Sequence, residues 1–593
     1  MTPTENHRRV PVLVCGGGPV GLALAVELGL RGIPCLVIEP RRQPTRLRPR
    51  GKTLNTRTLE HFRRWGIAGR VRAAAPLPPS WSQDVSFCTT LLGTEITRFH
   101  GVLGLQDIGV SPELGQQLPQ YVTEDVLREV AVELAPVELR LGSRVTGVHP
   151  EADSVSVSVV DSDGNTQNVV ADFVVGADGA RSVVRESIGA AYVGAQALRP
   201  NTGVVFRCDD LASMVPRRPA VQTWVINDET PGMLGPVDRN GLWWLIAFGV
   251  DGTSPDLDPR RLVTGAVGRD LPVDIVSTDP WVARMELVDR CRAGRVFLVG
   301  DAAHLNPPFG GHGLNTGIGD AVDLGWKLAA TIDGWAGPGV LDAYSAERVP
   351  LHRRVIDEAA ANMSTLSPEL LGDDLTDPGA RGEEARARAA VRIQDTKSQE
   401  FFSLDLVLGH RYDGSPIIPA ATTDQAGPWQ SAAVPGRRLP HVWLEPDRST
   451  LDLVRLDHVV LSGPDTQLDP LRAAAVDQHM PLDVQRVPSD VMAGLGADWV
   501  VVRPDHIVAA VGTGEPPGRD LVTTLSGHAN SITPTPREEE SACQHSFSEP
   551  PATSDRTWSP SSSPPANDPA SSSVPATVRG SSSATPSTWC PAT

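Results

Sequence analysis

The sequence is poor in lysine and cysteine, has no excess of positive charge and contains no long apolar run. Among its 593 residues, 53 basic side chains stand against 71 acidic ones, and the net charge of -18 argues against nucleic acid as a partner. No apolar run reaches the ~18 residues that a membrane helix needs, so we expect no membrane span. Residues 1–9 are polar and lead directly into an apolar segment, which predicts that no signal peptide is present.

The seven cysteines form no Cys-x-x-Cys pair, and several lie in apolar, strand-like runs. This usage is typical of structural thiols in a reducing compartment, so we predict a cytoplasmic protein. The only lysines are Lys52, Lys327 and Lys397, a bias that fits a GC-rich genome and indicates no particular chemistry. We predict no metal site. The length predicts two to four domains, and 40% hydrophobic residues suffice for large cores.

A glycine-rich turn near the start of the chain predicts nucleotide binding. Residues 10–15 are expected to form a buried strand, 19–31 a helix and 34–38 a second strand. Glycines of the GxGxxG type let a pyrophosphate approach the helix start, and an acid after the second strand accepts ribose hydroxyls. The pattern leaves NAD and FAD open as ligands. The residues concerned are Gly16, Gly18, Pro19, Val20, Gly21 and Glu39.

Two further strands end in an acid beside a glycine. Asp178-Gly179 follows an apolar segment at 173–176, and a tight turn with a helix cap at Ser182 is the plain alternative for it. Gly300-Asp301 follows a second apolar segment at 295–299. A Pro-Pro and a Gly-Gly turn come next and then a helix, whose first backbone amides can hold negative charge.

In this order the three motifs resemble the FAD-dependent aromatic hydroxylases of the para-hydroxybenzoate hydroxylase fold, over roughly residues 8–360. The resemblance implies that Asp178 and Gly179 touch FAD and NAD(P)H, together with Arg185, and that Asp301 binds the ribityl chain. It also implies a flavin-contacting Arg50 and Gln120. The loop Pro307, Pro308, Gly311 and His312 would lie beside the ring, with no side chain assigned as a catalyst. The helix start at Gly311, Gly313, Leu314 and Asn315 would stabilise the reduced, anionic flavin.

The implied fold is α/β: a Rossmann-like FAD domain carrying the GxGxxG turn, an inserted mixed β-sheet substrate domain, a C-terminal thioredoxin-like α/β domain and a disordered tail. The thioredoxin-like domain has no Cys-x-x-Cys, which argues against a redox role. The resemblance implies that it serves packing and contacts in a homodimer or higher homo-oligomer. Serine, threonine and proline make up 35 of the last 63 residues, which predicts disorder. The expected ranges are 8–190 with 285–362 for FAD, 80–115 with 191–284 for the substrate sheet, 363–425 for a helical connection, 426–527 for the thioredoxin-like domain and 528–593 for the tail.

The resemblance implies a monooxygenase that uses FAD, NADPH or NADH, and O2 to hydroxylate a small phenolic or polyketide-derived ring through a flavin C4a-hydroperoxide. Antibiotic biosynthesis and aromatic catabolism are the expected settings. Baeyer–Villiger or epoxidising oxygenation of a polyketide is the alternative reaction, and a non-catalytic flavin sensor is a third reading. The Trp-x-Trp-x-Ile-Pro signature of flavin halogenases is absent. We expect the pocket between the flavin and the inserted sheet, with ordinary sheet core as the alternative for each candidate: Trp224, Met233, Trp243, Trp244 and Phe248.

Overall fold

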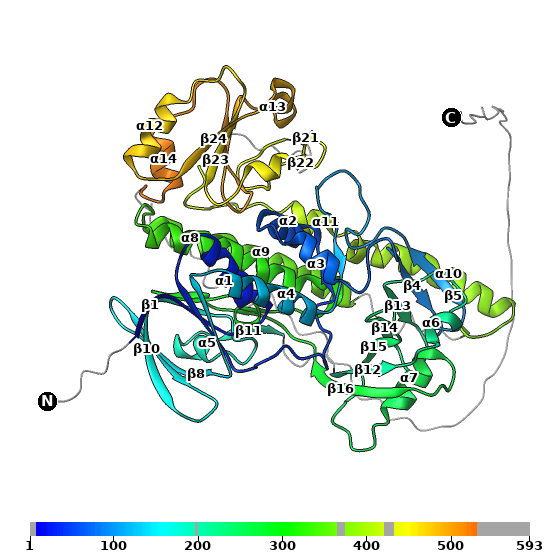
Figure 1. Cartoon of the computed structure of the whole chain (residues 1–593). Helices are drawn as coiled ribbons and strands as arrows, with labels where there is room; N and C mark the ends of the chain where they lie inside the picture. The colour runs from blue at the N-terminus through cyan, green and yellow to red at the C-terminus, as the bar shows by residue number, and fades with distance from the viewer. Residues whose placement is uncertain (1–7, 196–199, 365–373, 420–431, 530–593) are drawn as a thin grey trace, which may run out of the picture. The chain divides into compact units, whose positions relative to one another are not determined.

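The computed structural model describes residues 8–195, 200–364, 374–419 and 432–529, and the predicted tail lies outside these ranges except at its first residues. It is a mixed α/β structure with several sheets (Figure 1). The largest sheet contains parallel strands, of which β1 pairs with β2 and β10, β2 with β7, and β10 with β19. Along the sheet the order is β18 (Arg292–Ala293), β19 (Val296–Leu298), β10 (Thr166–Gly176), β1 (Arg8–Cys15), β2 (Cys35–Glu39) and β7 (Val137–Leu141).

A β-meander extends β10 on its outer part. Strand β8 (Arg144–Pro150) pairs with β9 (Val155–Val160), and β9 pairs in antiparallel fashion with β10. The Asp163-Gly164 turn connects β9 to β10. The parallel strands β1, β2 and β7 lie outside the meander, and helix α1 (Pro19–Leu30) packs on them.

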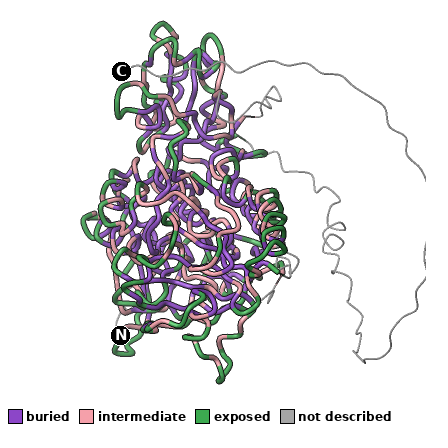
Figure 2. The backbone as a smooth tube through the Cα atoms, turned by 90° about the vertical axis from the view of Figure 1, so that its right-hand side faces the viewer, coloured by how far each residue is buried: buried purple, intermediate pink, exposed green. Residues whose placement is uncertain are grey.

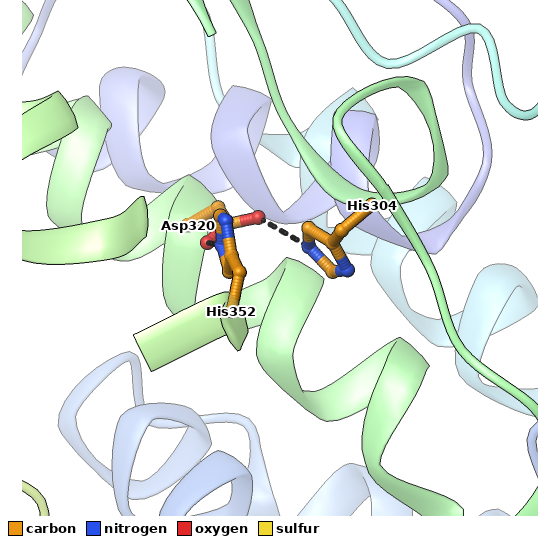
Figure 3. Close-up of side chains that lie close together, drawn as sticks. All are labelled: His304, Asp320 and His352. Carbon is orange, nitrogen blue, oxygen red and sulfur yellow. Dashed lines mark hydrogen bonds and ion pairs between the residues drawn. The ribbon is translucent and has the colours of Figure 1, made fainter. Parts of the chain in front are cut away.

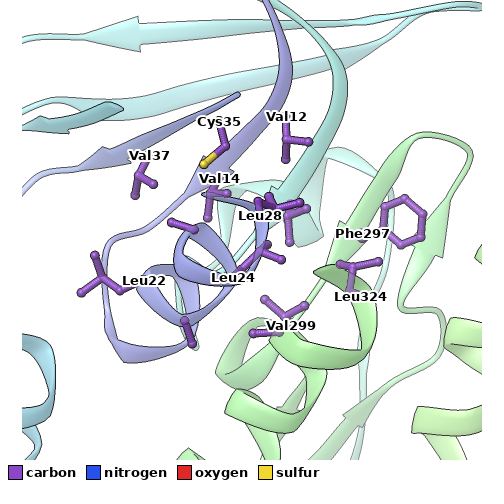
Figure 4. Packing of buried hydrophobic residues seen from close by; sticks show 14 of the residues in the cluster. Val12, Val14, Leu22, Leu24, Leu28, Cys35, Val37, Phe297, Val299 and Leu324 are labelled. Atoms are coloured by element: carbon purple, nitrogen blue, oxygen red, sulfur yellow. The ribbon is translucent and has the colours of Figure 1, made fainter. Parts of the chain in front are cut away.

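Helix α1 (Pro19–Leu30) is apolar on all sides because it is covered on all sides. Leu22, Leu24 and Leu28 pack among strand residues such as Val12 and among residues of α8 such as Leu324 (Figure 4). Pro19 occupies the first helical turn, where its missing N–H costs no hydrogen bond. Helix α1 also contacts α4 (Gln120–Glu133) and α8 (His312–Ile332), so one continuous core joins the sheet to three helices.

A seven-stranded sheet is assembled from two separate segments of the chain. Strand β4 from the first segment pairs in parallel with β13 from the second, whereas the other pairs are antiparallel. The order is β16 (Asp274–Val282), β12 (Pro200–Arg207), β15 (Leu242–Phe248), β14 (Gly232–Pro236), β13 (Gln222–Val225), β4 (Val85–Cys88) and β5 (Glu95–Phe99). A three-stranded sheet links it to the core: β11 (Tyr192–Ala195), β17 (Met285–Val288) and β20 (His304–Leu305).

The remaining elements are short, apart from two long helices that follow α8. The short strands are β3 (Thr53–Leu54) and β6 (Gln116–Gln117), which pair with each other. The long helices are α9 (Pro338–Ser364) and α10 (Ala380–Phe401). The others are α2 (Thr56–Arg64), α3 (Ala68–Ala74), α5 (Val183–Ser187), α6 (Leu211–Met214), α7 (Pro259–Val267), α11 (Leu404–Leu408) and the 3₁₀ turns η1 (Gly300–Ala302) and η2 (Phe309–Gly311).

The C-terminal segment forms its own four-stranded sheet. Strands β23 and β24 are parallel, whereas β25 is antiparallel to both β23 and β26. The elements are the hairpin β21 (Trp443–Glu445) and β22 (Arg448–Ser449), η4 (Thr450–Leu453), β23 (His458–Ser462), α12 (Asp469–Asp477), β24 (Leu482–Arg486), α13 (Ser489–Leu495), β25 (Trp499–Val502), β26 (Val508–Gly512) and α14 (Arg519–Leu525).

Buried ion pairs join this sheet to the helices of the core. Arg503 donates to Glu347 of α9 at 2.6 and 2.9 Å and to Asp323 of α8 at 3.1 Å. Lys327 contacts the same two carboxylates at 2.6–2.9 Å. An unpaired charge at this depth would be strongly destabilising, so each side of the contact requires the other. Buried residues, purple in Figure 2, accordingly fill the interior, and exposed ones, green, lie mainly on turns and outer helices.

Several elements differ in extent from the sequence prediction. Helix α8 is not among them, because it begins at His312, directly after the double glycine, where the sequence predicted the helix start. Helix α10 runs for 22 residues within 363–425, a range that the sequence predicted only as a helical connection. Within the described residues no helix combines the length and the hydropathy required to cross a membrane. The predicted domain boundaries remain predictions.

Candidate active site

A cavity of about 1080 Å³ opens at the carboxyl ends of β1, β2, β10 and β19. Parallel strands place their C-terminal turns at one edge, and ligands of open α/β sheets bind there. The opposite wall comes from the seven-stranded sheet, through residues of β12, β14, β15 and β16. The cavity therefore lies between the two large sheets.

Three glycines of the first turn have different physical roles. Gly16 has φ of 106°, and a Cβ there would lie 2.3 Å from the Ala177 carbonyl oxygen. A Cβ on Gly21 would lie 2.0 Å from the Gly16 oxygen. Gly18, by contrast, has open space where its Cβ would be and lines the cavity. Two glycines therefore allow close packing of the turn, and the third leaves the helix start bare toward the cavity.

Glu39 closes the first turn at the end of β2. Its Oε2 accepts the Gly17 N–H at 2.7 Å, and its Oε1 accepts from the backbone and side chain of Arg41 at 2.9 and 2.8 Å. Glu39, Pro19 and Val20 all line the cavity, whereas Gly21 does not. The carboxylate is thus fixed at the cavity edge with lone pairs left for a ligand.

The second turn presents an acid with a free oxygen. Asp178 accepts the Val184 N–H at 3.2 Å through Oδ2, while its buried Oδ1 has no hydrogen-bond partner among the described residues. Burial raises the pKa of this carboxyl. Asp178 and Gly179 line the cavity, but Arg185 does not. Arg185 donates to the Ala180 carbonyl at 3.0 Å and lies over the Tyr192 ring, so it braces the turn.

The third turn carries Asp301, whose carboxylate accepts no hydrogen bond from any described residue and opens into the cavity. Burial is the main cause of the raised pKa of this group. The following loop contributes Pro307, Pro308 and Gly311 to the cavity wall. Gly310 and Gly311 adopt φ of 77° and 67°, a left-handed conformation that favours glycine.

Helix α8 starts from this loop with its first amide groups unpaired within the helix. His312, Gly313 and Leu314 line the cavity. Burial lowers the pKa of His312 to about 4, so the ring is neutral. Asn315 does not line the cavity; its Nδ2 donates to the oxygens of Thr53 and Gly311 at 2.8 and 2.7 Å. It holds the helix start against β3.

Arg50 and Gln120 reach the cavity from the segments before β3 and at the start of α4. Arg50 donates to Asp279 of β16 at 3.2 and 2.5 Å, and Gln120 donates to Glu124 at 2.8 Å. Both side chains therefore have protein partners, which a ligand would have to share or replace.

The substrate-side candidates divide into two groups. Met233 and Trp244 line the cavity, whereas Trp224, Trp243 and Phe248 do not. Trp224 stacks on Phe87 with ring centroids 5.5 Å apart and belongs, with Phe248, to the core between the sheet and α10. Trp243 packs in the separate core on the other face of the sheet. Period-two alternation explains the position of Trp243, since Trp243 and Trp244 point to opposite faces of β15. Trp224 and Phe248 belong to the same core as Trp244, but both pack against Phe309 and do not reach the cavity.

The cavity residues that sequence reasoning missed include Lys52, Glu400 and Phe401. Glu400 and Phe401 end α10, a segment interpreted as a connection because no motif marks it. Glu400 accepts from Lys397 at 2.9 Å and from the Gly310 N–H at 3.3 Å. The scarcity of lysine was the only available signal for Lys52.

Behind the third turn, Asp320 of α8 lies between two imidazoles (Figure 3). Its Oδ2 accepts from Gly300 N and His304 Nε2, both at 3.0 Å. Its Oδ1 accepts from Arg348 Nε and His352 Nε2, both at 2.8 Å. Two histidines and a carboxylate could bind a metal ion. Here, however, the histidine nitrogens and Arg348 already occupy the carboxylate, so the cluster fixes the backbone of the residue before Asp301.

These features fit a dinucleotide with two phosphates and a sugar-like chain. The bare helix start at Gly18 provides a cradle for phosphate, and Asp178 and Asp301 offer carboxylate oxygens without protein partners. The volume accommodates a ligand larger than a typical drug together with a second small molecule.

Comparisons with known proteins agree with this geometry. Residues 9–359 match the family described as FAD binding domain, and residues 432–529 match aromatic-ring hydroxylase, C-terminal. A putative polyketide hydroxylase of Streptomyces halstedii is 34% identical over 567 residues, which cover 90% of this chain and 96% of the relative. A 4-methyl-5-nitrocatechol 5-monooxygenase of a Burkholderia species is 32% identical, covering 85% and 94%. The structure of aklavinone-11 hydroxylase with FAD and aklavinone superposes with a TM-score of 0.75 at 28% identity, covering 88% of this chain and 99% of that chain.

Proposed function

The chain belongs to the family of FAD-binding aromatic-ring hydroxylases, and from this premise we propose that it hydroxylates a phenolic, polyketide-derived ring at the expense of NADPH or NADH and O2. It is a flavoprotein aromatic monooxygenase. The observation that carries the proposal is the single cavity shared by three cofactor turns and by the wall of the seven-stranded sheet. A cofactor and an aromatic substrate can meet only in such a place.

The residues that would hold FAD come from all three turns. Gly16, Gly18, Pro19, Val20 and Gly21 form the turn for the pyrophosphate, and Glu39 accepts ribose hydroxyls. Asp178 and Gly179 contact the dinucleotide, and Arg185 supports them. Asp301 accepts from the ribityl hydroxyls, and Arg50 and Gln120 close the site from the other side. Gly311, Gly313 and Leu314 direct backbone amides at the ring edge, with Asn315 holding them in place.

FAD would supply two-electron transfer from NAD(P)H to dioxygen, with one oxygen atom inserted into a ring C–H bond and the other released as water. The chain itself positions the ring and excludes water. Met233 and Trp244 form an apolar wall for the substrate, and Pro307 and Pro308 stiffen the loop beside it. The neutral His312 carries no charge that would compete with the amides at the start of α8.

The relative's bound aklavinone favours a multi-ring polyketide as the substrate, which the volume of this cavity supports. The order of the C-terminal sheet, β24-β23-β25-β26 with helices α12 to α14, favours a thioredoxin-like domain without redox-active cysteines. We assign to it a packing role and contacts in a homo-oligomer. The buried free thiols and the need for NAD(P)H favour the cytoplasm as the place of action.

Purified protein tests the proposal directly. It should be yellow, with about one FAD per chain, and its oxidation of NADPH or NADH should accelerate when a phenol or a hydroxylated anthracycline-type ring is added. The product should gain one oxygen atom as an aromatic hydroxyl group. Colourless protein, or NAD(P)H oxidation that no aromatic compound alters, would refute the proposal. A lactone product would instead support the Baeyer–Villiger alternative.

A further inference from the structure

Lys52 is a cavity residue without a carboxylate partner. The chain has three lysines, and Lys327 and Lys397 are fully buried against Asp323 with Glu347 and against Glu400, respectively. Lys52 Nζ forms no hydrogen bond or ion pair with any residue that the structure describes. Its only recorded contact is with the ring of Trp244, whose centroid lies 3.5 Å away. Lys52 is only partly buried, and it lines the cavity without a protein anion beside it, so a ligand in the cavity can supply the partner.

The backbone fixes Lys52 at the junction of the two sheets. Its carbonyl accepts the Leu118 N–H at 3.0 Å, and the next residues form β3, which pairs with β6. Trp244 belongs to β15 in the seven-stranded sheet, and it is almost fully buried. Both side chains line the cavity together with Met233. The amine is therefore held on the substrate side of the cavity by two rigid elements.

Burial lowers the pKa of Lys52 to about 7, and no carboxylate is close enough to oppose this shift. Three ionisable groups on the other cavity walls either have a protein partner or carry no charge. Arg50 pairs with Asp279 of β16, Glu400 of α10 pairs with Lys397, and His312 of α8 is neutral. Asp301 of η1 opens to the cavity at the third turn. The face of Trp244 attracts an ammonium group, so Lys52 can exist in either protonation state near neutral pH.

We propose that Lys52 is a catalytic residue that accepts the proton of the substrate's ring hydroxyl and then binds the resulting oxygen anion. This assignment rests on the proposed hydroxylase function and names the base that function requires. In the step, the lone pair of Nζ forms an N–H bond while the substrate O–H bond breaks, and its electron pair stays on the ring oxygen. The proton returns to this oxygen before the product leaves. Trp244 is a positioning residue that holds the amine.

Because the chain has so few lysines, the amine can be observed directly. Reductive methylation of the holoenzyme with ¹³C-formaldehyde should label Lys52 and the terminal amine, since the other two lysines are enclosed in ion pairs. We expect two dimethylamine signals, because the terminal amine is labelled too and also titrates near neutral pH, and the Lys52 signal should titrate near pH 7, far below an ordinary lysine near 10.4. Its absence from the Lys52→Met variant would identify it. A Lys52 signal that titrates near pH 10 would overturn the proposal, whatever the activity.

Kinetics provide the second test. In the wild-type enzyme, kcat/KM for a phenol should rise with pH through about 7, because only the neutral amine can accept the proton. Lys52→Met should lower kcat/KM by roughly 10²–10⁴-fold and abolish this rise. Lys52→Arg should bind an anion but lack the rise as well. With 4-methyl-5-nitrocatechol at a pH where it is already ionised, Lys52→Arg should recover, whereas Lys52→Met, which cannot bind the oxygen anion, should recover only in part.

Arg46→Met is the matched control. Arg46 also lies over an aromatic ring, that of Tyr121 at 5.0 Å, but it does not line the cavity, so its removal should leave the pH rise intact. Persistence of the rise in Lys52→Met would refute the role of Lys52. A changed flavin reduction potential in substrate-free Lys52→Met would refute it too, because the amine would then face the cofactor. If the wild-type enzyme shows no substrate-stimulated NAD(P)H oxidation, the proposed function fails instead.

Discussion

Replacing Asp320 with asparagine should both destabilise the protein and weaken flavin binding. The carboxylate accepts four hydrogen bonds, two of them from Gly300 N and Arg348 Nε, and it is completely buried. His352 and Arg348 hold the pKa of Asp320 well below its usual range against the opposing effect of burial, so the group is charged. An amide has one acceptor oxygen, and its NH₂ group would face two donors.

The expected decrease in the free energy of unfolding follows from these contacts. Removing one member of a buried ion pair typically costs about 3–5 kcal/mol, and the two lost charge-assisted hydrogen bonds, at about 1.5–3 kcal/mol each, are contained in that figure. We expect the melting temperature to fall by roughly 3–5 °C, because the unfolding entropy of a chain of this size is about 1 kcal/mol per kelvin. Because Asp320 fixes the amide of Gly300, Asp301 should also become less well placed, and FAD affinity should fall.

Calorimetry and the rise of flavin fluorescence on heating measure both effects in one sample. Asp342→Asn is the matched control, since Asp342 forms a surface ion pair with Arg292 and its side chain is 57% exposed. Such a pair contributes about 0–1 kcal/mol, so the control should melt within ~2 °C of wild type. If Asp320→Asn melts as the control does, the buried cluster does not stabilise this turn, and the reasoning is wrong.

Three other perturbations test the site and the stability of the chain. Asp301→Ala should lower FAD affinity by roughly 10- to 150-fold, the equivalent of about 1.5–3 kcal/mol, and undiminished flavin fluorescence quenching at limiting FAD would contradict this. Gly18→Ala should fold normally but bind FAD weakly, whereas Gly21→Ala should fail to fold well because its Cβ would lie 2.0 Å from the Gly16 oxygen. Circular dichroism measures folding and absorbance measures flavin content, and equal results for the two variants would be evidence against the assigned roles. Burial lowers the pKa of His312 to about 4 and of His410 and His458 to about 3. The unfolded chain therefore binds more protons below pH 6.5, so stability should fall as pH drops from 6.5 toward 4, with a slope of about 1.4 kcal/mol per pH unit for each histidine; a melting temperature that stays constant from pH 7 to 5 would disprove it.

The sequence predicted the elements that carry motifs. It did not predict the features that depend on contacts between distant segments of the chain. The β1 turn, the Asp178-Gly179 turn and the Gly300-Asp301 turn were predictable because glycine and acid positions follow from backbone geometry at strand ends. The start of α8 at His312 was less clear, since three of its first eight residues are glycines, which disfavour a helix. The double glycine before it was the better indicator.

Side-chain direction on the inserted sheet could be predicted only in part. Adjacent tryptophans on a strand must face opposite ways, but the sequence does not tell which one faces the cavity. Trp244 does so because β15 pairs with β12 and β14 in the observed register. Lys52 carried no motif at all, and its significance depends on the absence of a nearby anion, which only the three-dimensional arrangement reveals.

Helix α10 has a consequence for re-engineering substrate choice. Its last turn contributes Glu400 and Phe401 to the cavity wall, and the Phe401 ring lies 4.9 Å from that of Phe99 on β5. The backbone of Phe401 also accepts the Leu103 N–H at 2.9 Å. A chimaera that exchanges only the seven-stranded sheet with a relative would therefore inherit one wall of the pocket from each parent. Exchanging residues 380–401 together with the sheet would take both contacting surfaces, the end of α10 and the strands that it packs against, from the same protein.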